Sequence, residues 1–245
     1  KSQIKSALFY PSVLLTVAVS VTIFMLIKVV PIFTEMYEGM VVEIPGATAA
    51  IMSASAFLSG TGGFTSLVLL IVTIVSFKIG LQKSYQFRKA WHAFTFKIPV
   101  FGDLIRKSLL ARISLVMGNL NQAGVDILES LDIAKSVSTN TIVTESLENI
   151  KKGVFSGETL TALFAKEKIF PPTFSQLISV GEQTGSLDSM FASVAQYYEE
   201  EFDTAVRNLS SLIEPIMIVF MGLTIGGLML ALYSPIFNVG AFMGQ

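Results

Sequence analysis

The stretch GEQTGSLDSMFASVAQYYEEEFDTAVRNLSSLIEPIMIVFMGLTIGGLMLALYSPIF, residues Gly181–Phe237, predicts a turn followed by one long helix. Gly181 and Gly185 favour the end of a preceding helix, because glycine tolerates the left-handed conformation that terminates helices, and Ser186 can cap the next one. The new helix first carries four acidic residues at positions 199–203 and must lie in water there. Ile216–Phe237 then has no charged side chain and is long enough to cross a bilayer. The stretch therefore predicts a single helix that passes from water into a membrane.

The composition indicates an integral membrane protein. Hydrophobic residues make up 52% of the 245 residues and charged residues only 14%, which is too apolar for a soluble domain of this length. The net charge of −1 and the lack of a basic run argue against nucleic-acid binding. With no cysteine and a single histidine, His92, the sequence lacks the ligands for disulfides, thiolate nucleophiles and cysteine or multi-histidine metal sites. We therefore expect no cofactor and no metal site.

Two further apolar stretches predict membrane spans. Residues 12–30 carry only Lys28, which lies close enough to the end of the span for its ammonium group to reach the headgroups. Residues 64–81 carry only Lys78. Pro31 disfavours continuation of the first helix. Together with residues 212–237, these stretches predict three transmembrane helices.

The segment between the first two spans, residues 31–63, is predicted to be a loop. Turns are expected at Pro45-Gly46 and at Gly60–Gly63. The apolar piece between them, Ala47–Leu58, is too short to span a membrane.

Basic residues predict the orientation of the spans. The loop has no lysine or arginine, whereas lysines precede the first span and a basic region follows the second. By the positive-inside rule, the loop is extracytoplasmic, and residues 1–11 and 84–209 are cytoplasmic. The third span then runs outward and leaves residues 238–245 as an extracytoplasmic tail.

Residues 84–209 predict a compact helical bundle. Apolar residues recur at three- and four-residue steps from Leu104 to Leu120, the period of one helical face, and Ala123-Gly124-Val125 interrupts them. Shorter helices follow with short connections, which suits antiparallel neighbours; they are expected at residues 127–134, 142–152, 160–166 and 173–180. The start of the long helix completes the set. The predicted fold class is all-α, with three transmembrane helices and a cytoplasmic six-helix bundle.

The first and third spans form an internal repeat. Ser6-Ala-Leu-Phe-Tyr-Pro11 aligns with Ser210-Ser-Leu-Ile-Glu-Pro215, and a Pro-Ile-Phe triplet follows each at the same spacing, at Pro31 and at Pro235. Matching spacing favours duplication over the generic use of proline near helix ends. A duplicated module predicts a further cytoplasmic domain before Lys1, of which residues 1–11 would be the end.

Three features of the long helix allow a structural and a functional interpretation. Gly222 and Gly226 form a Gly-x-x-x-Gly strip for close helix packing, with a partner in the same chain or in another subunit. Glu214, next to Pro215, suits an interfacial anchor better than a proton relay, because a relay needs partners deeper in the membrane. The four acids at 199–203 suit a solvated face better than a metal cluster, because successive helix positions point in different directions.

The motifs of common enzymes are missing from the sequence. It holds no Gly-x-x-x-x-Gly-Lys-Ser/Thr phosphate loop, no Gly-x-Ser-x-Gly nucleophile elbow and no His-Glu-x-x-His zinc motif. Gly60-Thr-Gly-Gly63 lacks the lysine and falls on the wrong side of the membrane. We therefore expect no enzyme, and any ATP must be hydrolysed by another protein.

Several motifs, spaced along the chain, carry a resemblance to a known family. In chain order they are Ile98-Pro99-Val-Phe101-Gly102, Ala123-Gly124-Val125, Phe170-Pro171, Gly181-Glu182-Gln-Thr184-Gly185-Ser-Leu187-Asp188, Tyr197-Tyr198-Glu199, Leu212-Ile-Glu214-Pro215 and Pro235-Ile-Phe237. Together they closely resemble the type II secretion system F family, the inner-membrane platform proteins of type IV pili and type II secretion. Ser234 is a minor departure, since the family usually has an apolar residue there.

The resemblance implies an architecture and a set of partners. The family has two cytoplasmic six-helix domains and three membrane helices in the bacterial inner membrane, forms homo-oligomers and is not enzymatic. Its members bind a hexameric cytoplasmic ATPase and help pilin or pseudopilin subunits to join or leave a filament. The motif residues that the resemblance marks are Gly181, Glu182, Thr184, Gly185, Leu187, Asp188, Glu214, Pro215 and Pro235.

These observations lead to one functional hypothesis and two alternatives. We expect residues 84–209 to dock with the ATPase and the helix from Leu187 to Phe237 to carry its motion into the bilayer. A channel or transporter subunit would need polar residues within the membrane, and the spans offer few. A scaffold without motion is the other alternative, and the sequence does not separate it from a coupling protein. The choice between a pilus and a secretion pseudopilus also stays open.

Overall fold

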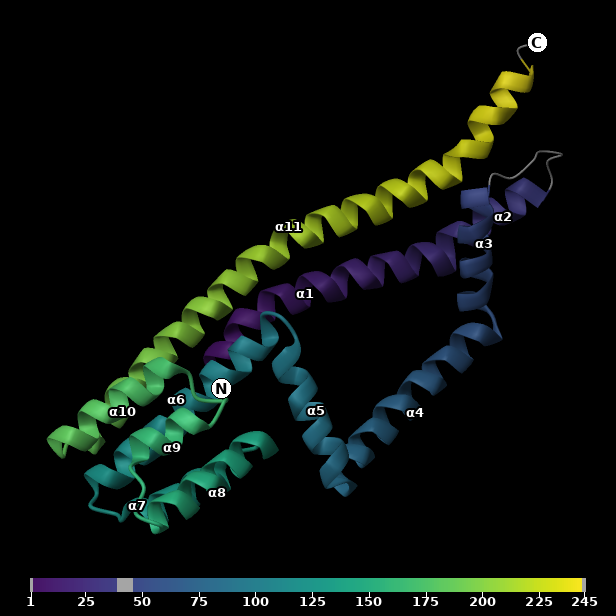
Figure 1. Ribbon diagram of the computed structural model, residues 1–245. Coiled ribbons are helices and arrows are strands. Elements are labelled where there is room, and N and C mark those ends of the chain that lie inside the picture. Colours follow the sequence, from purple (N-terminus) through teal and green to yellow (C-terminus); the bar gives the residue numbers. More distant parts are fainter. Residues whose placement is uncertain (1, 39–45, 244–245) are drawn as a thin grey trace. The chain divides into compact units, whose positions relative to one another are not determined.

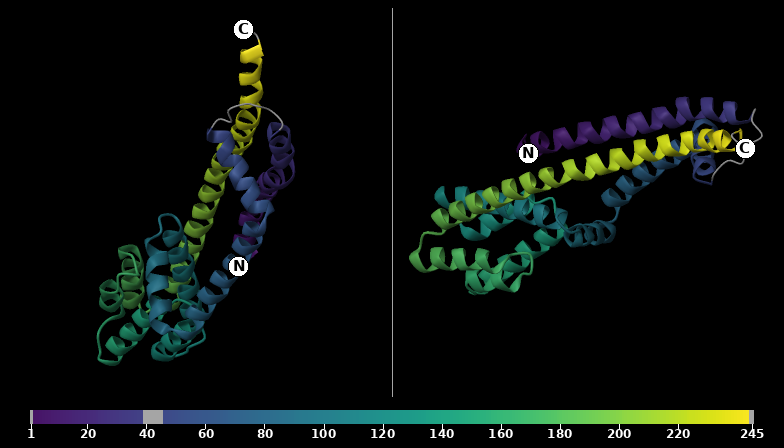
Figure 2. Two further views of the ribbon diagram at one scale, coloured as in Figure 1. Left: turned by 90° about the vertical axis from the view of Figure 1, so that its right-hand side faces the viewer. Right: turned by 90° about the horizontal axis from the view of Figure 1, so that it is seen from above.

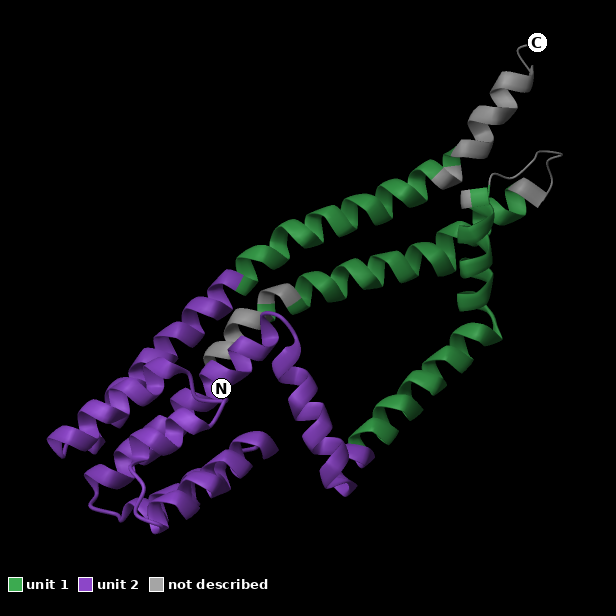
Figure 3. Cartoon of the chain, viewed as in Figure 1, with its two compact units in different colours: residues 1–78, 209–245 green, residues 79–208 purple. Residues whose placement is uncertain are grey.

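The chain divides into two compact units, which are described separately. A computed structural model describes residues 2–38 and 46–243. Residues 1–78 and 209–245 form one unit, here called the span unit, and residues 79–208 form the other, called the bundle unit (Figure 3). The described residues form helices and turns and contain no strand (Figures 1 and 2). The predicted all-α fold class is therefore confirmed.

The helices follow one another with short connections. The span unit contains α1 (Ser2–Phe24), a π-helical turn η1 (Met25–Val29), α2 (Val30–Glu38), α3 (Gly46–Ser59) and the greater part of α4 (Thr61–Lys83). The bundle unit contains the end of α4 and then α5 (Tyr85–Lys97), α6 (Phe101–Gln122), α7 (Ile127–Val137), α8 (Thr141–Phe155), α9 (Leu160–Lys166) and α10 (Pro172–Thr184). The last helix, α11 (Leu187–Met243), begins in the bundle unit and ends in the span unit.

Three described segments are long and apolar enough to cross a membrane. They are Ser12–Met36, Thr61–Lys83 and the apolar part of Leu187–Leu230. Most of their large hydrophobic side chains are exposed, as lipid-facing side chains would be. The prediction of three apolar helices of spanning length is confirmed. The direction in which each would cross stays a prediction.

Pro31 does not end the first span, contrary to the sequence-based expectation. The helix widens into η1 immediately before the proline and continues as α2 to Glu38. Pro11, Pro215 and Pro235 also lie inside helices rather than near their ends. The predicted turn at Pro45 lies outside the described residues.

The widened turn and a serine of α3 compensate for the missing N–H group of Pro31. The Val30 N–H donates to the carbonyl oxygen of Met25, five residues back. The next carbonyl, that of Leu26, would in the same pattern accept from residue 31, but proline has no N–H to donate. The hydroxyl of Ser55 donates to this Leu26 oxygen at 2.5 Å instead. Continuation of the helix through Pro31 is thus supported by a side chain far along the sequence.

The apolar piece of the predicted loop forms α3, which packs on η1 and α2. Its Ser55 is only 2% exposed. Val30 and Leu228 are the buried centre of the span unit, and the partly buried side chains around them are Met25, Leu26, Phe33, Ile51 and Met52. Only Gly60 separates α3 from α4, so the predicted turn at Gly60–Gly63 is shorter than expected.

The bundle unit has an aromatic-rich core. Phe164, Phe174 and Phe191 are fully buried. The Phe164 ring centroid lies 4.7 Å from that of Phe170 and 4.9 Å from that of Phe174. Aliphatic side chains of α6, α7 and α8 complete the core, including Leu110, Ile113, Met117, Leu131, Leu147 and Ile150. This core holds together helices whose connections are too short to do more than turn the chain.

The predicted six-helix composition of residues 84–209 omitted α5 and is therefore incomplete. The bundle unit, all of whose residues are described, contains six complete helices, α5–α10, and the first part of α11 packs into the same core. Between Tyr85 and Lys97, α5 is mainly aromatic and basic. It lacks the aliphatic repeat by which the other helices were recognised.

Replacing Ser55 with alanine should destabilise the span unit. The Leu26 carbonyl would lose its donor in an apolar environment, which costs about 1–3 kcal/mol. The melting temperature of the purified full chain in detergent, followed by circular dichroism, measures this loss.

Ser53→Ala is the matched control, because Ser53 lies on the same helix and donates only to Ala49 O, four residues back. Pro31→Ala restores a backbone donor near Leu26, so Ser55→Ala should cost less in that background than in the wild type. Equal costs in the two backgrounds would contradict this account of the proline.

Candidate functional site

Gly185 closes the turn between α10 and α11. Its backbone adopts φ 69° and ψ 17°, the left-handed conformation that residues with a side chain rarely take. The N–H groups of Gly185 and Ser186 both donate to the carbonyl of Gly181, the latter at 2.9 Å. The turn ends α10 at Thr184 and lets α11 begin at Leu187.

Gly181 lies where α10 and α11 approach most closely. A Cβ atom at this position would lie 2.8 Å from Met190 Cγ and 3.3 Å from Leu187 Cα. Gly181 is buried, and Leu187 packs against the bundle core. The missing side chain therefore lets the first turn of α11 pack directly on α10.

The remaining motif residues of this turn make local contacts. Thr184 donates to the Val180 carbonyl at 2.7 Å, and its Oγ1 lies 2.5 Å from Ser186 Oγ. Asp188 is in the first turn of α11, where a carboxylate interacts favourably with the helix dipole. The structure thus brings the predicted motif residues between positions 181 and 188 together in one turn.

Glu182 caps the start of α9, a role that the sequence analysis missed. Its Oε1 accepts from the Leu160 N–H at 2.7 Å, and its Oε2 accepts from the Thr161 N–H at 3.0 Å and from the Thr161 hydroxyl at 2.6 Å. Burial raises the pKa of the Glu182 carboxyl, but the hydrogen bonds from Thr161 and Leu160 outweigh burial and hold the pKa below its usual value. No local pattern signals this contact, because its partners are 21 and 22 residues away in sequence.

The first turns of α11 are buried in the bundle core. Phe191, Val194 and Tyr198 are all buried. The ring centroids of Phe191 and Phe164 are 6.3 Å apart, and the Tyr198 hydroxyl lies 3.2 Å from Thr173 Oγ1. Burial raises the pKa of the Tyr198 hydroxyl. The long helix is therefore an integral part of the bundle and does not merely lie on its surface.

Helix α6 also holds α11 in place. A Cβ atom on Gly118 would lie 3.2 Å from the backbone nitrogen of Ala192, so the two helices are in close contact there. Elsewhere on α6, Lys107 Nζ lies 2.9 Å from Glu201 Oε2 and 3.0 Å from Asp103 Oδ2. Burial alone would lower the pKa of Lys107, but its bonds to Glu201 and Asp103 outweigh burial and raise it. A close backbone contact and a shared ion pair thus fix α11 on α6.

The other predicted site residues lie farther along α11. Glu214 and Pro215 are exposed. Around Gly222 and Gly226, no described atom lies within 4 Å of an added Cβ atom. The described residues therefore contain no intramolecular partner for the Gly-x-x-x-Gly strip. The side chain of Pro235 lies outside the described part of the chain.

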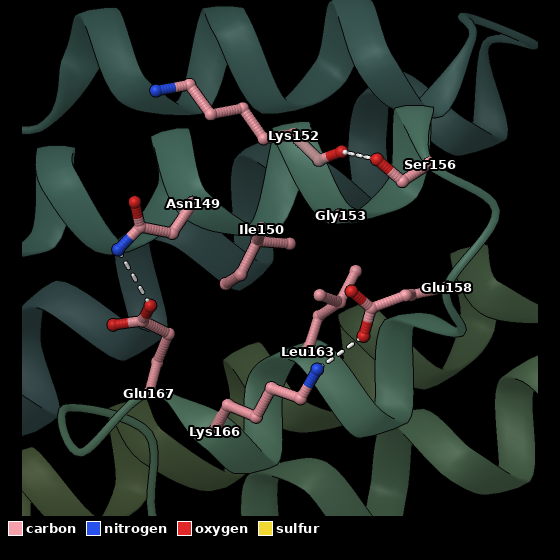
Figure 4. Close-up of a pocket in the computed structure, with 9 residues that line it drawn as sticks. All are labelled: Asn149, Ile150, Lys152, Gly153, Ser156, Glu158, Leu163, Lys166 and Glu167. Atoms are coloured by element: carbon pink, nitrogen blue, oxygen red, sulfur yellow. Dashed lines mark hydrogen bonds and ion pairs between the residues drawn. The ribbon is translucent and has the colours of Figure 1, made fainter.

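A pocket of about 320 Å³ opens between the end of α8 and α9 (Figure 4). Charged side chains that line the pocket are paired with other residues of the bundle unit. Lys166 pairs with Glu158, and Glu167 accepts from Ser146 at 2.6 Å and from Asn149 at 3.0 Å. Among the described residues there is no group of three or more His, Cys, Asp or Glu that could hold a metal ion. These contacts stabilise the junction of α8 and α9.

Residues 113–235, about half of the chain, match the sequence profile of the family described as type II secretion system (T2SS), protein F. The chain belongs to this protein F family. The matched stretch begins within α6 and ends near the end of α11. It therefore contains the Gly185 turn, the capping Glu182 and most of the long helix.

Individual relatives cover both branches of the protein F family. The chain is 33% identical to a type IV pilus assembly protein PilC of Myxococcus xanthus over 98% of its own length and 57% of the relative. It is 34% identical to PilC of Pseudomonas aeruginosa, over 100% of its length and 65% of that protein. A type II secretion system protein F of Pseudomonas aeruginosa is 29% identical over 100% of the chain and 60% of that protein. The chain thus spans about three fifths of the length of the relatives it matches.

In this protein F family member, Glu182→Gln should destabilise the bundle unit in a pH-dependent way. Because folding lowers the pKa of Glu182, its carboxylate stabilises the fold at pH values above 4.5, the ordinary pKa of a glutamate side chain. That stabilisation is lost as the pH falls through the lower folded-state pKa. The variant should lose about 1–3 kcal/mol at pH 7, measured by urea unfolding of the full chain in detergent.

The difference between Glu182→Gln and the wild type should shrink as the pH falls through the lowered folded-state pKa of Glu182, because both side chains are neutral below it. The exposed Glu129 supplies the control, because Glu129→Gln removes the same charge from the same unit. A loss of stability that is equal for both variants would rule out a specific role for the cap.

Proposed function

We propose that this chain is part of an inner-membrane platform protein of a type IV pilus or type II secretion assembly machine. The observation that carries the proposal is the match of residues 113–235 to the protein F family, together with relatives named as pilus assembly and secretion proteins. Three apolar helices of spanning length support a place in the bacterial inner membrane. According to this proposal, the protein is a non-enzymatic part of the machine.

The proposed topology follows the distribution of charge. The bundle unit lies in the cytoplasm, because lysines precede the first span and a basic region follows the second, whereas the segment between them has no lysine or arginine. The segment between the first two spans is extracytoplasmic, and the third span runs outward. Residues 1–11 lie on the cytoplasmic side.

We further propose that the bundle unit docks with a hexameric cytoplasmic ATPase and that α11 carries the resulting movement into the membrane. Two observations support this coupling role. The start of α11 is fixed in the bundle core through Phe191 and Tyr198 and on α6 through the Lys107–Glu201 ion pair. The helix then continues without interruption into its apolar part. A force applied to the bundle would therefore act directly on the third span, which would pass it to pilin or pseudopilin subunits in the bilayer.

Stiffness of α11 at the boundary of the two units is the property that this role requires. Inserting two glycines after Leu209 in the full-length protein should abolish filament assembly while the protein stays in the membrane. Two glycines cost about 2 kcal/mol of helix stability relative to two alanines, so the helix would bend or fray at that point. Filament yield and membrane fractionation measure the two outcomes.

An insertion of two alanines at the same point is the matched control. It changes the register of the helix as much as the glycine pair does, but keeps the helix stiff. Coupling through α11 would be contradicted if filaments assembled equally well with the glycine pair and with the alanine pair. A pull-down from membranes tests the partner: co-purification of a hexameric ATPase supports the platform, and ion flux after reconstitution would favour a channel instead.

Homo-oligomer formation is proposed to use the open Gly222 and Gly226 strip. Because no described atom of the chain packs there, a helix of another subunit can approach closely. Gly222→Leu with Gly226→Leu should shift the protein toward smaller species in detergent, as measured by light scattering after size exclusion. Thr224→Leu enlarges a side chain on another face of the same helix and should have little effect. An unchanged oligomer in the double variant would exclude this strip as the interface.

A further inference from the structure

Helix α5 presents two opposite faces of different chemistry. Tyr85, Lys89, His92 and Phe96 follow one another at intervals of four, three and four residues and therefore share one face. Phe87, Trp91 and Phe94 are spaced by four and three residues and lie on the opposite face of the helix. We call the first set the bundle face and the second the aromatic face. Their contacts show that the two faces have different surroundings.

The bundle face is fastened to α8 and to the core. The Tyr85 hydroxyl donates to Glu145 Oε1 at 2.5 Å, and Lys89 Nζ lies 2.6 Å from Glu145 Oε2. His92 Nδ1 accepts from the Thr141 N–H at 3.1 Å, at the start of α8. Burial, helped by the charge of a neighbouring arginine, lowers the pKa of His92 and keeps this nitrogen free to accept. Phe96 packs against the bundle core, so the orientation of α5 about its own axis is fixed.

The aromatic face points away from the bundle core. Phe87 is 41% exposed and Phe94 is 55% exposed. Trp91 lies between them, with its ring centroid 5.8 Å from that of Phe94. Phe87 and Phe94 are exposed and Trp91 is half-buried, and the apolar surface that this row presents is costly to leave in water.

The aromatic face begins immediately after an apolar helix of spanning length. α4 ends at Lys83, and Ser84 alone, in an extended conformation, separates it from α5. Ser84 Oγ accepts from the Phe87 N–H at 3.2 Å and so starts the new helix. The Phe87 ring packs near Gly80, where an added Cβ atom would lie 3.3 Å from it. The aromatic face thus begins within one turn of the end of α4.

Charge around the aromatic face is positive. Residues 79–97 contain four lysine or arginine residues, Lys83, Arg88, Lys89 and Lys97, and no acid. Lys89 is engaged by Glu145 on the bundle face. Lys83 and Lys97 are exposed at the two ends of the aromatic row. Basic residues beside aromatic ones suit the surface of a bilayer that contains anionic lipid.

We infer that the aromatic face of α5 is a docking surface for an anionic lipid bilayer. Phe87, Trp91 and Phe94 enter the boundary between headgroups and acyl chains, and Lys83 and Lys97 contact lipid phosphates. Continuity with α4 and the acid-free charge pattern favour lipid over a protein partner. Since the opposite face of α5 is fastened to α8, the bilayer would hold the bundle unit through this helix as well as through α11.

Trp91 is the only tryptophan of the chain, so its fluorescence reports on this face without labelling. The full chain is reconstituted into phosphatidylcholine vesicles with and without phosphatidylglycerol. Phosphatidylcholine brominated at shallow acyl positions should quench Trp91 strongly, and more strongly when phosphatidylglycerol is present, whereas deeply brominated lipid should quench it less. Aqueous iodide should quench Trp91 less in vesicles than after transfer to detergent-free denaturant. The inference would be overturned if iodide quenched the fluorescence of Trp91 in vesicles and neither brominated lipid did.

Variants separate the aromatic and the electrostatic contributions. Phe94→Ser should weaken quenching by shallow brominated lipid, whereas Phe155→Ser, which removes an 83% exposed ring from the end of α8, should not. Lys83→Gln with Lys97→Gln should remove the effect of phosphatidylglycerol on quenching. Arg112→Gln with Lys168→Gln removes two exposed charges from elsewhere in the bundle unit and should leave that effect intact.

Dilution distinguishes lipid from a second copy of the chain. The lipid quenching should be unchanged when the ratio of protein to lipid is lowered tenfold. Lipid contact that appears only on dilution would mean that another copy covers the aromatic face at higher density, and this would overturn the inference as stated. The wild-type measurements decide the question even if a variant fails to fold.

Discussion

The burial of the start of α11 in the aromatic core is the interaction on which the rest of the structure depends. Phe191 packs near Phe164, and Tyr198 contacts Thr173, so residues that a long surface helix would expose are inside the bundle. Each buried aromatic side chain contributes about 1.5–3 kcal/mol, more than a surface ion pair provides. The same helix then becomes an apolar segment of spanning length. The last helix of the bundle unit and the third apolar segment are consequently one continuous element, α11.

Two side chains, Ser55 and Glu182, form hydrogen bonds with backbone groups that have no partner within their own helix. At Pro31 the helix lacks a donor, and the Ser55 hydroxyl supplies one to Leu26. At the start of α9 the free N–H groups need an acceptor, and the Glu182 carboxylate supplies it. Both polar side chains therefore have a structural explanation that requires no chemistry on a substrate. This agrees with membership of a family whose relatives are named for assembly and secretion.

Helix α5 directly follows the second apolar helix and is fastened to α8 by polar contacts. Part of its bundle face relies on the ion pair with the half-buried Glu145, and a single ion pair of this kind is weak. An attachment of this kind gains from a second surface that holds the helix from the other side. Lipid at the aromatic face would provide such a surface.

The sequence by itself determined the helical class, the three apolar segments and the end of α10 at Gly185, because composition, periodicity and the conformational freedom of glycine act over a few residues. It also singled out the motif at 181–188, but it did not reveal that Glu182 caps α9 through residues 21 and 22 positions away. Only the tertiary structure decided that the first span passes through Pro31, that α5 joins the bundle, and that Gly222 and Gly226 meet no described atom of this chain. Each of these depends on groups brought together by folding, such as Ser55 with Leu26, and no local pattern records such a contact.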